Sequence, residues 1–96
     1  MLKLEVDGEQ VEFWFSHKIG TIEKPDGVLE DRRFTLCEGK VDGDLYAGVA
    51  ICNPTDQYCK KTGRKLALAD FLNDAFPTSR AARKQVWSAY LAKARV

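Results

Sequence analysis

The spacing of hydrophobic residues changes once along the chain, and this change most limits the folds it can adopt. Up to about residue 52, hydrophobic residues alternate with polar ones, which is typical of half-buried strands. After Asn53-Pro54, where a capping Asn precedes a Pro suited to the first helical position, they recur at helical spacing. Strands followed by helices predict an α+β fold, in which an antiparallel sheet has its helices packed on one face.

Four strands are predicted in the first half of the chain, at residues 2–6, 11–16, 32–37 and 45–52. The first two flank an Asp-Gly turn at residues 7–8, and the last two flank a connection over residues 38–44 that holds two glycines. Each pair is therefore predicted to form a β-hairpin, which gives a sheet of about four strands. Residues 19–31, which contain a Pro-Asp-Gly turn, are interpreted as a long loop or a weak pair of strands.

Two helices are predicted in the second half of the chain. The first covers about residues 64–75 and ends before a proline, and a short helical turn over residues 54–61 precedes it. The second begins after Thr78 or Ser79, since either hydroxyl can cap a helix, and it runs to about Ala94.

Length and composition favour one small domain. With 96 residues, of which 45% are hydrophobic, the chain is large enough for one core and too short for two. Residues 1–96 are expected to form a single domain with a β-rich half, 1–52, and a helical half, 53–96. No stretch resembles a membrane span or a signal peptide, and three cysteines, an odd number, argue against a disulfide framework. These features predict a cytoplasmic protein with free thiols.

Charge is distributed unevenly between the two halves, although the net charge is only +1. Residues 1–48 hold eleven acids and six bases, for a net charge of −5, and residues 49–96 hold nine bases and three acids, for a net charge of +6. An anionic partner for the second half, head-to-tail contact between copies, or mutual neutralisation within one fold would each account for this asymmetry. Because only one half is basic, the balance argues against a nucleic-acid binder.

Each predicted helix has an arginine at the start of its apolar stripe. Arg64 lies one turn before Leu68, and Arg83 lies within the stripe, four positions before Trp87. The helix dipole disfavours a cation in the first turn, and a cation in an apolar stripe must be paired, reach solvent or face a ligand. Two interpretations stay open: a site for phosphate or carboxylate groups, or structural ion pairs with acids such as Glu12 or Asp31.

The candidate binding site combines anion donors with aromatic rings. Its predicted members are the cations Arg64, Arg80, Arg83 and Lys84, the hydroxyl of Ser79, and Trp87 and Tyr90 as platforms for a nucleobase. Guanidinium and hydroxyl donors suit phosphate oxygens, and aromatic rings stack on bases. Arg83 is expected to matter more for binding than for folding.

The sequence gives little support to metal binding or catalysis. The spacing between Cys52 and Cys59 is too wide for a zinc knuckle, even with Cys37 and His17 as further ligands. His17 is the only histidine, and no nucleophile elbow or phosphate-binding loop accompanies it. No metal, no cofactor and no catalytic residue are therefore predicted, and the protein is expected not to be an enzyme.

The segment from Ile51 to Leu68, ICNPTDQYCKKTGRKLAL, followed by an Arg-rich helix with two aromatic residues, resembles a cassette in small accessory proteins of bacteriophages. Within that group, a sheet followed by two short helices is similar to the Thoeris anti-defence proteins. These are phage sponges that sequester a cyclic ADP-ribose isomer made by host immunity. The resemblance implies that arginines on the C-terminal helices hold phosphates, a role for Arg64, Arg80 and Arg83, and that the protein works in the host cytoplasm.

The hypothesis from the sequence is a phage-encoded anti-defence protein that sequesters a phosphorylated, cyclic nucleotide signal. The alternative is a protein inhibitor of a host defence complex, like an anti-CRISPR, that docks through one charged half. Neither hypothesis involves a membrane. A homo-oligomer, most simply a symmetric dimer, is also predicted, because the last helix has a second face of small residues. This face consists of Ala81, Ala82, Ser88, Ala89 and Ala92.

Overall fold

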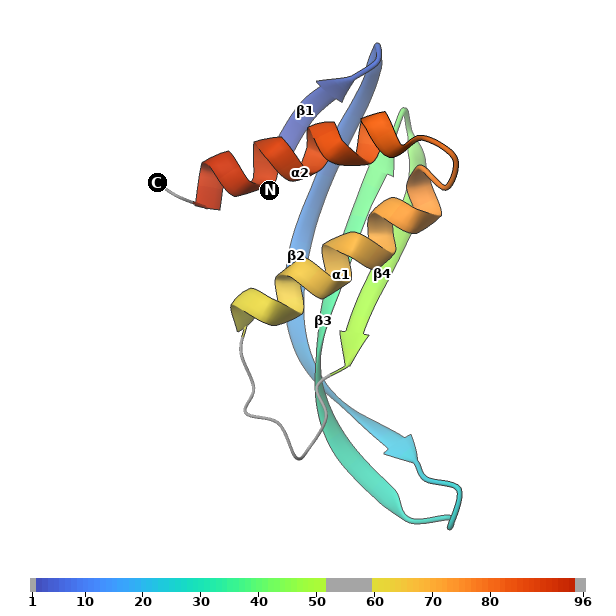
Figure 1. Ribbon diagram of the computed structural model, residues 1–96. Coiled ribbons are helices and arrows are strands. Elements are labelled where there is room, and N and C mark those ends of the chain that lie inside the picture. Colours follow the sequence, from blue (N-terminus) through green and yellow to red (C-terminus); the bar gives the residue numbers. More distant parts are fainter. Residues whose placement is uncertain (1, 52–59, 95–96) are drawn as a thin grey trace.

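Four strands and two helices make up the computed structural model, which describes residues 2–51 and 60–94. The elements are β1 (Leu2–Val6), β2 (Glu9–Glu23), β3 (Leu29–Val41), β4 (Asp44–Ile51), α1 (Lys60–Ala75) and α2 (Arg80–Ala94). The strands are antiparallel and follow one another across the sheet in sequence order. Both helices lie over the same face of this sheet (Figure 1). The predicted α+β fold, with two hairpins followed by two helices, is confirmed.

Two Asp-Gly turns fix the register of the outer strand pairs. Asp7 and Gly8 between β1 and β2 have φ angles of 52° and 83°, and Asp42 and Gly43 between β3 and β4 have φ angles of 53° and 89°. Two successive positive φ angles are the type I′ geometry, whose twist matches that of the flanking strands. The sequence predicts a longer second connection, over residues 38–44, but only the Asp-Gly pair remains outside the strands.

The segment between the two predicted hairpins is a pair of strands. Of the two interpretations of residues 19–31, the strand pair is confirmed and the long loop was wrong. Strands β2 and β3 stay paired up to a short turn in which Gly27 has a φ of 84°. This part of the hairpin, residues 19–33, extends beyond both helices and is called the arm (Figure 1). Ile19 and Leu29 on the arm are each 68% exposed, because no helix of the described chain covers them.

The core lies between the sheet and the helices. It consists of Val6, Val11, Phe13, Cys37, Val41, Ala67, Leu68, Phe71, Leu72, Phe76, Ala82, Val86 and Tyr90. Helix α1 packs closely on β4, because a Cβ atom on Gly48 would lie only 2.2 Å from the backbone nitrogen of Phe71. At the same edge of the sheet, the backbone nitrogen of Val49 donates a hydrogen bond to Oδ2 of Asp70 on α1, at 2.9 Å. These contacts fix α1 on the sheet.

The face of the sheet that points away from the helices also carries apolar side chains. Trp14, Phe34 and Leu36 are half-buried there, and Val49 and Ile51 are 43% and 56% exposed. Strand alternation puts these side chains opposite to those of the core. These five residues are called the outer face, and neither described helix covers it.

The predicted helices are found, with one boundary displaced. Helix α1 begins at Lys60 rather than at about residue 64, so Lys60 and Lys61 precede Arg64 and Lys65 on the same helix. Most of the predicted helical turn over residues 54–61, with Cys52 and Cys59, lies outside the described residues. Neither described helix is long and apolar enough to cross a membrane.

The predicted small-residue face of α2 is interrupted. Ala82 is only 2% exposed and belongs to the core, so its assignment to a free surface was wrong. Ala89 is half-buried, whereas Ala81, Ser88 and Ala92 are exposed. The homo-oligomer that this face suggested stays a prediction.

Candidate functional site

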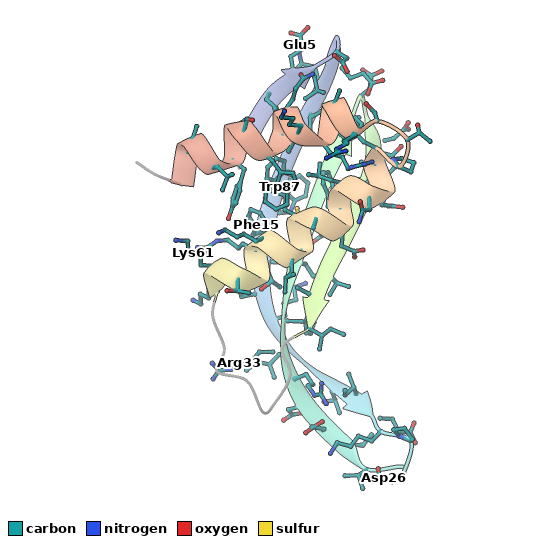
Figure 2. The ribbon with its side chains drawn as sticks, viewed as in Figure 1. Glu5, Phe15, Asp26, Arg33, Lys61 and Trp87 are labelled. Atoms are coloured by element: carbon teal, nitrogen blue, oxygen red, sulfur yellow. The ribbon has the colours of Figure 1, made fainter. Side chains whose placement is uncertain are left out.

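A groove of about 630 Å³ opens beside the start of α1 and the end of α2, over strands β1 and β2, and is called the main groove. Four of the residues that line it are cations: Lys61, Arg64, Lys65 and Lys93. No Asp or Glu occurs among its described lining residues. Figure 2 shows Lys61 and Phe15 close to one another beside the start of α1. The wall formed by the helices is therefore strongly basic.

Three of these cations come from one face of α1. Arg64 and Lys65 follow Lys61 by three and four positions, which places the three side chains beside one another on the helix surface. Like charges at this spacing repel one another, and the dipole of α1 adds to the penalty because they lie near its N-terminus. No acidic residue occurs in the first turn of α1 to offset these charges. An anion in the main groove would relieve the repulsion.

Gly63 allows the first turn of α1 to lie directly on the sheet. A Cβ atom at this position would be 2.5 Å from Oγ1 of Thr35 on β3, and Thr35 is fully buried. Glycine inside a helix costs about 1 kcal/mol relative to alanine. Here it permits the close approach that holds the cations of α1 over the aromatic side chains of β2.

The floor of the main groove is aromatic. The rings of Phe15 and Tyr90 have centroids 5.8 Å apart, and Phe15 also makes an edge contact with Phe13, with centroids at 5.8 Å. Phe13 and Tyr90 belong to the core, whereas Phe15 is only half-buried. Leu2, Trp14 and Leu91 complete the apolar lining. The groove thus presents cations on one side and a ring surface on the other.

The pKa of His17 reflects the positive potential beside this groove. Its Nδ1 lies 3.0 Å from Oγ1 of Thr35, within hydrogen-bond distance. Partial burial lowers the pKa of the His17 imidazole, and the positive charges of Lys60 and Arg64 lower it further. The same field that disfavours a proton on His17 favours an anion.

The sequence-predicted residues divide between the two ends of the helical layer. Arg64 and Tyr90 line the main groove. Trp87 makes an edge contact with Tyr90, with ring centroids 6.0 Å apart, and packs against the core. Arg80 and Lys84 are exposed near the start of α2, about 20 Å and about 14 Å along the helix from Lys93 at the end that lines the groove.

Ser79 and Arg83 have structural contacts at that far end. Oγ of Ser79 accepts a hydrogen bond from the backbone nitrogen of Ala82 at 3.2 Å, so Ser79 caps α2. Nη1 of Arg83 donates a hydrogen bond to the backbone carbonyl of Phe76, the residue that follows α1. This bond satisfies one of the carbonyl groups that a helix leaves open at its C-terminus.

The alternative interpretation, ion pairs between these arginines and the acidic half, is not found at the acids named for it. Glu12 lies 3.9 Å from Lys3, and Asp31 accepts a hydrogen bond from Thr21 at 2.9 Å. Within residues 2–51 and 60–94, the recorded ion pairs do not include Arg64 or Arg83. Arg64 therefore stays available to a ligand.

Sequence reasoning missed most of the residues that line the main groove, among them Phe15, Lys61, Lys65 and Lys93. Lys61 and Lys65 share a helix face with Arg64, and this signal was visible in the sequence once α1 was extended to its true start. Phe15 and Lys93 come from β2 and from the end of α2, so only the fold brings them to the groove.

The described lining of the main groove holds no thiol, imidazole or carboxylate. Within the described ranges, no three His, Cys, Asp or Glu side chains gather where they would hold a metal ion. Cys37 is buried in the core, and burial raises the pKa of its thiol to about 12. The cations of the main groove suit it to the binding of an anion.

Comparison with protein-family models, with curated proteins and with solved structures gave no match. The function is therefore argued from the main groove itself.

Proposed function

We propose that this protein binds a small ligand with phosphate groups and an aromatic ring, the chemistry of a nucleotide, in the main groove. One observation carries the proposal: Lys61, Arg64 and Lys65 project from one face of α1 beside the ring of Phe15, with no carboxylate in the described lining. Guanidinium and ammonium groups bind phosphate oxygens, and a half-buried ring is a surface on which a base can stack.

The dimensions of the main groove agree with this ligand class. Its volume of about 630 Å³ falls within the range of small-molecule sites. Cations at the rim and an apolar floor match a ligand that is anionic at one end and flat at the other. The biological role that we propose is sequestration of a phosphorylated nucleotide signal by a phage-encoded protein, in line with the resemblance noted above. Sequestration requires affinity and no reaction.

A thermal-shift titration with ADP tests this function, with adenosine and inorganic phosphate as the two halves of the ligand. At ADP concentrations 100-fold above its Kd, linkage predicts stabilisation by about 2.7 kcal/mol, a rise in Tm of about 10 °C or more. Adenosine or phosphate alone should stabilise much less. Cyclic nucleotides in the same screen would indicate which phosphate geometry fits best.

Arg64→Met is the matched test of the site. Loss of one charge-assisted contact should weaken ADP binding by about 1.5–3 kcal/mol, or about 10- to 150-fold. Arg80→Met removes the same charge from an exposed position at the far end of α2 and should leave the Kd unchanged. The proposal fails if no nucleotide raises the Tm, or if the two variants weaken binding equally.

The second candidate function is the protein inhibitor, and the outer face is the observation that favours it. Apolar side chains that remain exposed on a protein surface often mark a binding interface. A phage-protection assay separates the two candidates. An inhibitor that docks through the outer face should lose protection in the double variant Val49→Lys, Ile51→Lys and keep it in Arg64→Met. A nucleotide sponge should show the opposite pattern.

A further inference from the structure

A second basic groove lies where the arm leaves the body of the molecule, and is called the arm groove. It has a volume of about 390 Å³ and is lined by His17, Lys18, Ile19, Arg33 and Lys60. Four of these five side chains carry basic groups, and none is acidic. Figure 2 shows Arg33 below the start of α1, on the side toward the arm.

The two grooves are neighbours that share the first turn of α1 as a wall. Lys60 lines the arm groove, and Lys61, the next residue, lines the main groove. On β2, Phe15 and His17 point to the same face two positions apart, a distance of about 7 Å along the strand. The lowered pKa of His17 has Arg64 of the main groove among its causes, so the grooves also share an electrostatic field. Together they form one basic strip.

The strip concentrates positive charge on a molecule whose net charge is only +1. Its cations are Arg33, Lys60, Lys61, Arg64, Lys65 and Lys93. A hollow lined by charges of one sign focuses the field and attracts ions of the opposite sign. A mononucleotide in the main groove places its phosphate against α1 and does not extend into the arm groove.

We propose that the strip binds a linear nucleotide chain joined by phosphodiester bonds, a dinucleotide or longer, with one phosphate in each groove. The inference rests on the proposed function, because the first nucleotide occupies the main groove. A basic groove that follows the backbone, next to ring surfaces for the bases, is the usual way to bind single-stranded nucleic acid. Ile19, which is 68% exposed in the arm groove, offers an apolar surface to the second nucleoside.

Anisotropy titrations with the labelled thymidine series pT, pTpT and an eight-nucleotide strand test the inference. We expect pTpT to bind at least about 10-fold more tightly than pT at low salt. Its affinity should also fall more steeply with salt, because each phosphate neutralised on a single strand adds about 0.7 to the slope of log K against log salt. The eight-nucleotide strand should bind at least as well as pTpT.

The double variant Arg33→Met, Lys60→Met removes two cations of the arm groove, both on exposed side chains. It should reduce the advantage of pTpT over pT to about twofold or less, without a change in the affinity for pT. The matched control, Arg80→Met with Lys84→Met, removes the same charge from the start of α2 and should leave both affinities as they are.

The outcomes separate the two proposals. If pT binds and pTpT binds no more tightly, the arm groove holds no phosphate, and the proposed function stands without it. If neither binds and ADP gives no thermal shift, both proposals fail. If the arm-groove variant weakens pT and pTpT by the same factor, the two grooves do not hold separate phosphates, and the inference is overturned.

Discussion

The N-terminal ends of α1 and α2 are alike in sequence and differ in what surrounds them. Each has an arginine that continues an apolar stripe, Arg64 on α1 and Arg83 on α2. Arg64 lines the main groove, whereas Arg83 folds back to the carbonyl of Phe76. The short connection between the helices brings the end of α1 within reach of Arg83, whereas Arg64 faces the main groove beside the end of α2. An arginine in an apolar stripe therefore identifies an unusual position, but the sequence does not show whether the side chain binds a ligand or stabilises the fold.

The largest expected effect comes from the position on which α1 rests. In Gly48→Ala, the new Cβ atom would lie 2.2 Å from the nitrogen of Phe71 and 2.3 Å from the carbonyl oxygen of Ala67. Because both are helix backbone, α1 must move as a body, and we expect a loss of about 3 kcal/mol or more. Urea unfolding should show this loss, and ADP binding should fall with it. Ala47→Ser, at the exposed neighbouring position, is the control; equal Tm values for the two variants would contradict close packing at Gly48.

Arg83→Met should destabilise the protein without affecting binding. The substitution keeps the apolar stem and removes the hydrogen bond to the Phe76 carbonyl. A hydrogen bond from a charged donor contributes about 1.5–3 kcal/mol to stability. Removal of a cation from the positive end of the α2 dipole raises stability by up to about 1 kcal/mol. A net loss of about 1.5 kcal/mol corresponds to about 6–12 °C in Tm. If the Tm is unchanged and ADP binding falls, Arg83 faces a ligand as the sequence first suggested.

Arg64→Met should leave the Tm unchanged or raise it, in contrast to the lower Tm expected for Arg83→Met. It relieves repulsion with Lys61 at the N-terminal end of α1, and we expect the apo protein to be as stable as the original or more stable by about 0.5 kcal/mol. A clear decrease in Tm would show that Arg64, like Arg83, holds the fold together. The two arginines would then both be structural and would not differ in role.

The smallest expected effect is the pH dependence from His17. Its pKa in the folded protein lies below the usual 6.5, so the unfolded chain binds the proton first as the pH falls. The contribution of His17 to the free energy of unfolding is therefore fully present above pH 6.5 and declines below it. The decline is small because the ring is only partly buried. Urea unfolding at about pH 7.5 and about pH 5.5 should show a smaller decline in His17→Gln than in the original protein. Equal declines would mean that His17 does not sense the cations of α1.

Local signals in the sequence were sufficient to predict the elements of the fold. Alternation of apolar residues, the Asp-Gly turns and the hydroxyl cap at Ser79 are each read within a few residues, and all three are found. The arm was ambiguous because its exposed strands have no buried face to produce a clear alternation. Pairing with the partner strand stabilises it, and that information lies outside the segment.

The main groove was harder to predict because its parts come from distant segments. Phe15, Lys61 and Lys93 meet there only when α1 and α2 cross the sheet. The hydrogen bond from Arg83 to the carbonyl of Phe76 was not predicted, since the sequence does not show which carbonyl a long side chain will reach. The best unused signal was Gly63, a glycine within a helix next to several cations, which marks a close approach to another element.

The hydrogen bond between Val49 and Asp70 has a consequence for how the protein behaves at high concentration. An unpaired edge strand offers its N–H groups to other chains, and the apolar side chains of Val49 and Ile51 make β4 attractive for such growth. Asp70 already occupies the N–H of Val49 and places a carboxylate beside it. A strand from another molecule would have to displace this carboxylate before it could extend the sheet. A side chain of α1 thus protects the edge against filament formation, and this allows β4 to remain apolar.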